Sequence, residues 1–290
     1  MKKVKKAVIL VGGFGTRFLP ATLCTPKELF PLVDKPILFY HLKECVDSGI
    51  THVCLVSSEE KHSINDLVNP NAKLIQRLKT QNKMALLDSY YSVMNKLKIK
   101  IVYQKEQNGT AGALACAQDW LNGDPFVLYY GDDLIEADVP AAKQIIDVYN
   151  QTGKSVCILQ KVKKEDIHKY GSAVLQKIKG KDYYNMSAIV EKPKTEEAPS
   201  LYASIGRYVL TQEIFDELDN LQAINGEYYV TAAINNLAER GRMNATVVCG
   251  TYHDCGNKLE FAKTITEYML KSEEFGQEYR KYIKNLAKKL

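Results

Sequence analysis

Short runs of apolar, often β-branched residues alternate with amphipathic helical patterns through the first half of this chain. The runs occupy residues 4–11, 52–57, 99–104, 126–130 and 155–161. Helical patterns lie between them, near residues 36–49, 84–94, 113–121 and 145–153, with an irregular region around residues 69–71. Strands that alternate with helices build parallel sheets with helices on both faces. The pattern therefore predicts a doubly wound α/β sheet, with ligands bound beyond the carboxyl ends of its strands.

The alternation of strand and helix patterns ends after residue 170. Runs at residues 172–178, 186–191 and 202–210 follow one another without a full helix between them, which favours antiparallel strands. Two helical patterns, a further strand and a mostly helical end with a break near residues 272–276 complete the chain. The expected fold class is α/β: a Rossmann-like doubly wound mixed sheet, mostly parallel, with antiparallel strands in the second half and a C-terminal helical arm.

The expected domain organisation follows from the same change in the order of strands and helices. We expect one domain over residues 1–258, with halves of about 1–150 and 151–258, because no linker or low-complexity segment divides it. Residues 259–290 form a separate helical segment, which we regard as a candidate oligomerisation arm.

Composition excludes several classes of protein. The 290 residues are 46% hydrophobic, enough for a large core, but no apolar run approaches the roughly 20 residues that cross a bilayer. The seven cysteines form no CxxC pair, which is typical of reduced, packed side chains. The net charge of +5 is concentrated in the last residues, at helical spacing, and we interpret it as a solvated helix face. We therefore expect a cytoplasmic protein that binds neither membranes nor nucleic acid.

The first candidate site is a glycine-rich segment that directly follows the run at residues 4–11. Glycines at the end of a strand let backbone N–H groups approach phosphate oxygens, and a nearby arginine and lysine would neutralise their charge. An ordinary turn with surface cations is the alternative, and the spacing fits neither a dinucleotide fingerprint nor a Walker loop. The residues predicted to bind a triphosphate are Gly12, Gly13, Gly15, Thr16, Arg17 and Lys27.

Two further candidates follow other strands. Asp132 comes after the run at residues 126–130, where a carboxylate facing a phosphate loop could hold Mg²⁺; a turn or cap is the alternative for Asp132 and Asp133. Gln104 ends the run at residues 99–104, and its amide offers a donor and an acceptor that can match the edge of a pyrimidine. The small residues from Gly109 to Ala113 would let a base lie against the backbone.

These segments resemble a known family. The loop from Gly12 to Arg17, followed by Pro26-Lys27-Glu28-Leu29 and Asp34-Lys35-Pro36, is similar to the signature of the sugar-nucleotide pyrophosphorylases. The segments Val190-Glu191-Lys192-Pro193, Ile205 to Thr211 and Tyr252 to Gly256 are similar to the bacterial UTP–glucose-1-phosphate uridylyltransferases (UDP-glucose pyrophosphorylases). The matches run in order over roughly residues 4–265.

The resemblance implies an activity and its substrates. Such enzymes transfer a uridylyl group from UTP to α-D-glucose 1-phosphate, with Mg²⁺, and release pyrophosphate. They form dimers or tetramers, so a homodimer or homotetramer is expected here.

The resemblance also implies roles for particular residues. By similarity the metal ligands are Asp132 and Asp254, and the catalytic residues are Arg17, Lys27 and Lys192. The nucleotide-binding set, by the same similarity, adds Val11 to the residues named above and includes Gln104, Gly109 and Asp132. The sugar phosphate would contact Gly171, Glu191, Lys192 and Glu227.

The chain departs from the family pattern at a few positions. The family's Gly-Leu-Gly-His-Ala is here Gly109-Thr110-Ala111-Gly112-Ala113, Val11 replaces an alanine, and Ala232 replaces an aspartate. The first two departures lie beside the expected base site, so transfer to another base or sugar, with dTTP or CTP for example, is the first alternative. A non-catalytic, nucleotide-sensing relative is the second.

Overall fold

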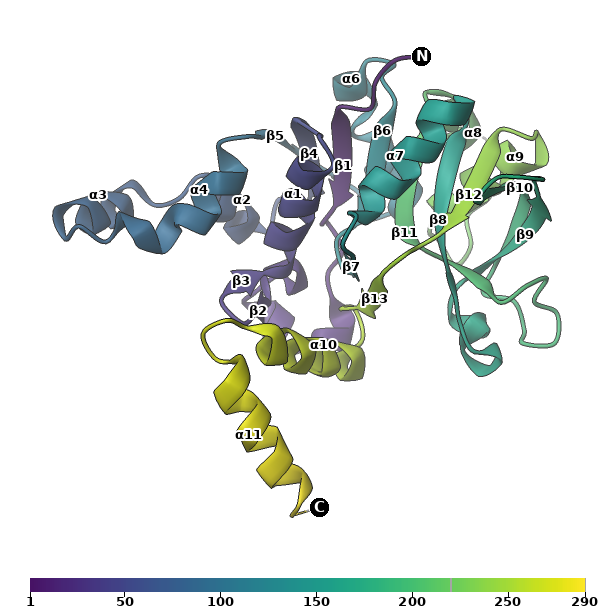
Figure 1. The fold of residues 1–290 in the computed structure, drawn as a ribbon. Coiled ribbons are helices and arrows are strands. Elements are labelled where there is room, and N and C mark those ends of the chain that lie inside the picture. The colour runs from purple at the N-terminus through teal and green to yellow at the C-terminus, as the bar shows by residue number, and fades with distance from the viewer. Residues whose placement is uncertain (220, 290) are drawn as a thin grey trace.

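A single nine-stranded sheet forms the centre of the computed structural model, which describes residues 1–219 and 221–289 (Figure 1). Its strand order is β5-β4-β1-β6-β11-β8-β12-β10-β9. The strands are β1 (Lys6–Leu10), β4 (His52–Ser57), β5 (Lys98–Tyr103), β6 (Phe126–Tyr130), β8 (Ser155–Lys161), β9 (Gly171–Lys177), β10 (Tyr183–Glu191), β11 (Tyr202–Leu210) and β12 (Met243–Val247). All nine runs predicted from the sequence are therefore strands of this sheet, with small shifts at several ends.

The strand directions correct one expectation. The sheet is mixed, as expected, but it is not mostly parallel: β1, β4, β5 and β6 pair in parallel and β8 pairs in parallel with β12, whereas the other four neighbouring pairs are antiparallel. The physical reason is that β9, β10 and β11 are joined by loops without a crossover helix, and a parallel pairing needs such a crossover. Strand β11 then lies antiparallel to both β6 and β8.

Helices pack on both faces of the sheet, because neighbouring residues of each strand point to opposite sides. Ala7 and Ile9 of β1 pack with α1 (Ile37–Asp47) and α7 (Ala141–Thr152) in one core cluster. Val8 packs on the other face with α5 (Thr110–Ala115), α8 (Glu213–Leu218) and α9 (Val230–Glu239). The remaining short elements are α6 (Gln118–Leu121) and the 3-10 turns η1 (Thr16–Phe18), η2 (Ala21–Leu23), η3 (Lys27–Leu29), η4 (Met84–Leu87) and η5 (Lys164–Lys169).

Three pairs of elements were not predicted. The region around residues 69–71, expected to be irregular, separates helices α2 (His62–Val68) and α3 (Ala72–Thr80), and the Asn71 side chain caps α3 by accepting from Lys73 and Leu74 N–H groups. The second pair is the small antiparallel ribbon of β7 (Asp133–Glu136) and β13 (Thr251–Asp254). A further small ribbon joins β2 (Pro31–Leu32) to β3 (Lys35–Pro36).

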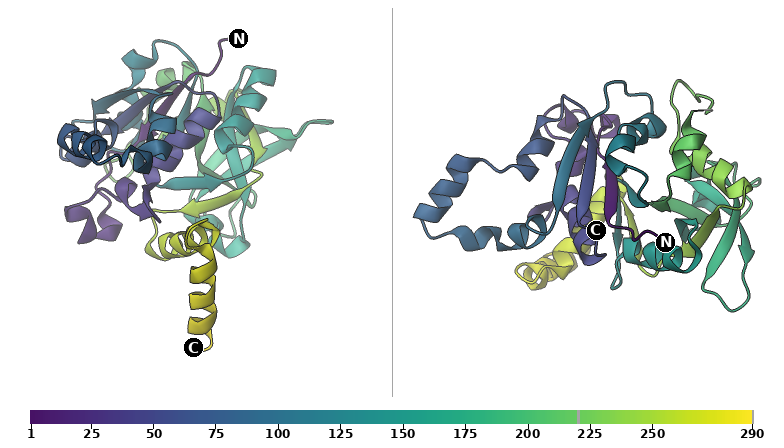
Figure 2. Two further views of the ribbon diagram at one scale, coloured as in Figure 1. Left: turned by 60° about the vertical axis from the view of Figure 1, so that its left-hand side comes forward. Right: turned by 90° about the horizontal axis from the view of Figure 1, so that it is seen from above.

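Two parts of the chain project from the body. Helix α3, together with α2 and α4 (Asp88–Met94), extends to one side of the sheet in two views (Figures 1 and 2). At the C-terminus, α10 (Lys258–Lys271) packs against the β2 region and α11 (Gly276–Ala287) points away, with the break near residues 272–276 that the sequence predicted. Throughout residues 1–219 and 221–289, no helix combines the length and apolar character needed to span a membrane.

A buried arginine joins the first helix to the middle of the sheet. Arg207 of β11 is fully buried, and its Nη2 donates to Glu44 Oε2 of α1 at 3.1 Å and to His41 Nδ1 at 2.8 Å. An arginine can only donate, so His41 must carry its proton on Nε2, which donates to the Gly131 carbonyl at 3.0 Å. This chain of contacts fixes the backbone immediately before Asp132.

We predict an acid-dependent loss of stability at His41. Burial, together with Arg207, lowers the pKa of His41 from its ordinary value of 6.5 to about 3. The unfolded chain therefore takes up this proton first as the pH falls, so the stability that His41 contributes is present above about pH 6.5 and is lost toward pH 3. In denaturant titrations at several pH values, the stability advantage of wild type over His41→Gln should shrink by about 1.4 kcal/mol per pH unit below pH 6.

The control is His62→Gln, at an exposed histidine, which should leave the pH dependence as in the wild type. Parallel pH profiles for wild type and His41→Gln would contradict the neutral, buried imidazole.

Candidate active site

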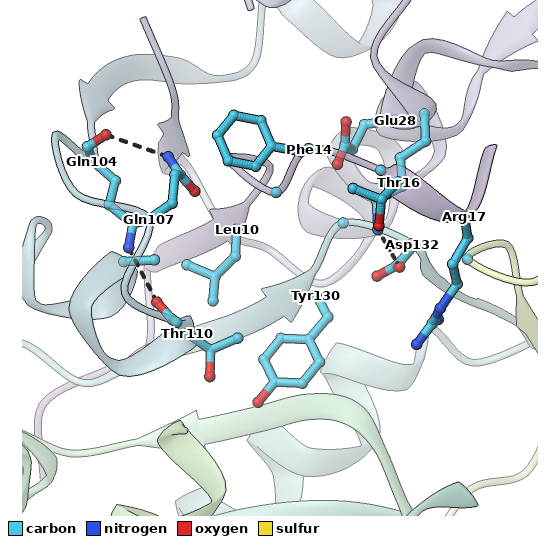
Figure 3. A pocket seen from close by; sticks show the side chains of 18 of the residues that line it. Leu10, Phe14, Thr16, Arg17, Glu28, Gln104, Gln107, Thr110, Tyr130 and Asp132 are labelled. Carbon is cyan, nitrogen blue, oxygen red and sulfur yellow. Dashed lines mark hydrogen bonds and ion pairs between the residues drawn. The ribbon is translucent and has the colours of Figure 1, made fainter. Parts of the chain in front are cut away.

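A cavity of about 530 Å³ opens beyond the carboxyl ends of β1 and β6, as expected for an open α/β sheet. Its lining includes the last residues of those strands, Leu10 and Tyr130. Figure 3 shows Gln104, Gln107 and Thr110 on one side of the cavity and Arg17 and Asp132 on the other. The sequence-predicted residues that line it are Gly12, Gly13, Gly15, Thr16, Arg17, Lys27, Gln104, Gly109, Asp132 and Glu227.

The glycine-rich loop turns sharply at the mouth of this cavity. Gly15 has a φ of 66°, in the left-handed region, and a Cβ there would lie 3.0 Å from the Thr22 side chain. Phe18, which ends η1, packs edge-on against Phe30 at 5.2 Å and against Phe261 of α10 at 5.7 Å between ring centroids. Helix α10 thus supports the loop that carries Arg17.

Lys27 and Asp132 form an ion pair at the charged end of the cavity. Burial lowers the pKa of Lys27, but the Asp132 and Glu28 carboxylates more than offset this, so its pKa lies above the ordinary value. Burial raises the pKa of Asp132, yet Lys27 outweighs it and the net direction is downward. Both groups are therefore held in their charged forms.

A second, deeper ion pair was missed from the sequence. Lys61 Nζ donates to Glu28 Oε2 at 2.8 Å and to the Val11 carbonyl at 2.7 Å, so it ties the start of the glycine loop to η3. The Val11 side chain is fully buried, and Val11 is not among the residues that line the cavity. The signal that could have identified Lys61 is its place just beyond the carboxyl end of β4, in a polar stretch that otherwise reads as a loop.

Asp132 and Asp254 face the same small volume beside Gly256. A Cβ on Gly256 would lie 2.5 Å from Asp132 Oδ2 and 3.1 Å from Asp254 Oδ1, so only glycine leaves this space open. The ribbon of β7 and β13 creates the arrangement, because it pairs Asp254 with Asp133. Burial and the negative charge of Asp132 raise the pKa of Asp254.

This pair of carboxylates would suit a magnesium ion whose other ligands are phosphate and water oxygens. Across the described residues, no group of three or more His, Cys, Asp and Glu side chains converges as a complete protein-only metal site. Mg²⁺ usually takes one or two protein carboxylates and completes its shell with phosphates and water. Two carboxylates at the charged end of the cavity satisfy the protein's part of that requirement.

The opposite end of the cavity is built from neutral hydrogen-bonding groups. Gln104 Nε2 donates to the Asn108 side-chain oxygen and to the Gly109 carbonyl, each at 3.1 Å. Gly109 has a φ of 102°, and a Cβ on it would lie 2.7 Å from the backbone nitrogen of Tyr228. The Tyr228 backbone is hydrogen-bonded to Asn108 O at 2.8 Å and to Ala111 N at 2.9 Å, so two distant loops are clamped together here.

Only one of the four residues predicted to contact the sugar phosphate lines the cavity. Glu227 lines the cavity, whereas Gly171, Glu191 and Lys192 lie outside its lining at adjoining ends of β9 and β10. Glu191 Oε2 lies 3.2 Å from the position of a Cβ on Gly171. Lys192 has an exposed side chain and a φ of 43°, an unusual value for a residue other than glycine and one that often accompanies function.

Comparison with known proteins identifies a family for this chain. The family model described as nucleotidyl transferase matches residues 6–270. A UTP–glucose-1-phosphate uridylyltransferase from Staphylococcus epidermidis is 40% identical over 99% of both chains, and one from Bacillus subtilis is 36% identical over 100% of this chain and 99% of the relative.

Solved structures give the same result. A UDP-glucose pyrophosphorylase from Acinetobacter baumannii, 31% identical, superimposes with a TM-score of 0.90 over 98% of this chain and 99% of its own. A UDP-glucose pyrophosphorylase complexed with UDP-glucose, also 31% identical, gives a TM-score of 0.85 over 93% of this chain and 100% of that chain. The chain therefore belongs to the nucleotidyl transferase family, within its UTP–glucose-1-phosphate uridylyltransferases.

Proposed function

We propose that this chain transfers the uridylyl group of UTP to α-D-glucose 1-phosphate and releases pyrophosphate. The observation that carries the proposal is a single cavity with two chemically different ends. Gln104 and the Gly109 loop form a neutral end suited to a base, and Arg17, Lys27 and Asp132 form a charged end suited to phosphates. The relatives' names and the UTP-bound relative from Acinetobacter baumannii, 31% identical with a TM-score of 0.89, support UTP as the nucleotide.

The mechanism that fits this site is an in-line attack by a phosphate oxygen of the sugar phosphate on the α-phosphorus of UTP. The attacking oxygen is already an anion, so catalysis consists of alignment and neutralisation of charge. Arg17 and Lys27 would neutralise the triphosphate and the departing pyrophosphate, and Lys192 would hold the sugar phosphate. Mg²⁺ held by Asp132 and Asp254 would supply further neutralisation of phosphate charge.

The sugar is expected between the ends of β9 and β10 and the loop that carries Glu227. Carboxylates bind pairs of sugar hydroxyl groups by accepting their hydrogen bonds, which suits Glu191 and Glu227. The nearby Glu227 carboxylate, and more weakly the Glu191 carboxylate, raises the pKa of the Tyr229 phenol.

We further propose a cytoplasmic location and a homodimeric or homotetrameric assembly. The seven cysteines, all described, are free thiols, as in reducing compartments. The projecting helix α11 exposes Tyr282 and Leu286, which suits contact with a second subunit.

The first test is the nucleotide requirement. Pyrophosphate release should be measured with glucose 1-phosphate and Mg²⁺, comparing UTP with dTTP, CTP, ATP and GTP. UTP should be strongly preferred. A preference for another base would keep the mechanism and refute the uridylyl assignment. No turnover with any of these nucleotides would refute glucose 1-phosphate as the acceptor, and no turnover with other sugar phosphates as well would refute catalysis.

A second prediction concerns Lys27. Lys27→Ala should lower kcat on the order of 10²-fold or more, as expected when an electrostatic contact to the transferring group is lost. Turnover is measured under saturating substrate, with thermal unfolding to establish that the variant is folded. Lys73→Ala, at an exposed position on α3, is the control and should behave as wild type. A nearly unchanged rate in Lys27→Ala would remove this lysine from the mechanism.

A third prediction concerns the clamp between the two loops. Gly109→Ala forces a side chain against the Tyr228 backbone and should separate the base loop from the Glu227 loop. Because small misplacements disrupt in-line alignment, kcat/KM should fall on the order of 10²-fold. Gly180→Ala is the matched control: Gly180 also has a positive φ, of 72°, but a Cβ there meets nothing within 4 Å. Equal effects of the two substitutions would show that only backbone strain was measured.

A further inference from the structure

The amide of Gln104 is oriented by two acceptors. Its NH₂ group has two hydrogens, and both are used, one by the Gly109 carbonyl and one by the Asn108 side-chain oxygen, each at 3.1 Å. A backbone carbonyl can only accept, so the nitrogen of the amide must face Gly109. Gln104 is also 94% buried (6% exposed), which leaves it little freedom to reorient.

This orientation directs the amide oxygen toward the nucleotide cavity. Gln104 Oε1 lies 3.5 Å from the position of a Cβ on Gly12, a residue of the cavity wall. Within residues 1–219 and 221–289, no protein group donates a hydrogen bond to this oxygen, and it is not among the polar atoms sealed away from the surface. The cavity therefore presents an acceptor, and not a donor, at this point.

Asn108 reaches Gln104 because residue 112 is a glycine. A Cβ on Gly112 would lie 2.7 Å from Asn108 Cγ and still closer to its side-chain oxygen, so any side chain at residue 112 would displace that of Asn108. The backbone of Asn108 is fixed independently by the Tyr228 N–H, at 2.8 Å. Gly112 stands where the pattern Gly-Leu-Gly-His-Ala has histidine, and this departure creates the space that the Asn108 side chain fills.

We propose that Asn108 is a positioning residue for base selection: it holds the Gln104 amide so that Oε1 accepts the imide N–H of uracil or thymine. This inference rests on the proposed function, since it assumes that the base binds at Gln104. Cytosine has an unprotonated ring nitrogen at that place and would set an acceptor against an acceptor. Turning the amide to suit cytosine would point Oε1 at the Gly109 carbonyl and lose both hydrogen bonds.

The test compares nucleotide discrimination, measured as the ratio of kcat/KM for UTP to kcat/KM for CTP with glucose 1-phosphate. Asn108→Leu removes one of the two acceptors, and the ratio should fall about tenfold, because the net worth of one hydrogen bond corresponds to a factor of that order. Asn108→Asp keeps an acceptor toward Gln104 and should retain most of the ratio.

A second variant disrupts the contact between Asn108 and Gln104 without substituting Asn108. Gly112→Ala should displace the Asn108 side chain and lower the ratio as Asn108→Leu does, and alanine suits the helix α5 in which residue 112 lies. Parallel losses with UTP and CTP, which leave the ratio unchanged, would mean a purely structural role and would overturn the inference. A loss of the ratio in Asn108→Asp as large as in Asn108→Leu would also overturn it.

The wild-type measurements separate the two hypotheses. If wild type prefers UTP and the variants keep its ratio, the proposed function stands and only the role of Asn108 fails. If wild type does not prefer UTP to CTP, the proposed uridylyl transfer itself fails, and the role of Asn108 fails with it.

Discussion

The structure depends on one buried cation, the guanidinium of Arg207. It lies 4.0 Å above the Tyr129 ring and is bound by Glu44 and His41, so a single side chain connects β11, α1 and β6. Removing one partner of such a buried pair typically costs about 3–5 kcal/mol, because the other charge is left without compensation. The His41 contact continues to the Gly131 carbonyl, and the position of Asp132 is therefore set by interactions in the core and not only by its own turn.

The antiparallel strand β11 explains why the site lies where it does. Because β11 is inserted between β6 and β8, the parallel strands of the first half and the mixed strands of the second half share one sheet. The ribbon of β7 and β13 then returns the chain from the second half to β6, which places Asp254 beside Asp132. The hydrogen bonds between Tyr228 and the Asn108–Ala111 segment bring the same two halves together at the other end of the cavity.

Sequence reasoning predicted the sheet well and the supporting contacts poorly. Strands β4, β6, β8 and β11 match their predicted ends because buried strands are continuous apolar runs, which local sequence reveals. The ribbon of β7 and β13 was not predicted, because strands of four residues show almost no periodic pattern in the sequence. The glycine loop could be predicted since its chemistry is local. The position of Lys61 after β4 was a signal in the sequence, but its pairing with Glu28 was not, because that contact joins segments 33 residues apart.

The two ends of the cavity offer different kinds of interaction: long-range attraction between charges at one end, and short directional hydrogen bonds at the other. This difference matters for how the choice of base could change in such a chain. Charges such as those of Arg17, Lys27 and Asp132 act over several ångströms, so in the proposed role they would attract any phosphate and would not distinguish bases. The Gln104 amide acts only through short, directional hydrogen bonds, so in the proposed role its orientation would distinguish bases without affecting the charged end. If the proposed role of Asn108 holds, substitutions at residues 108 and 112 would change base selection while the charged groups at the other end of the cavity stay in place.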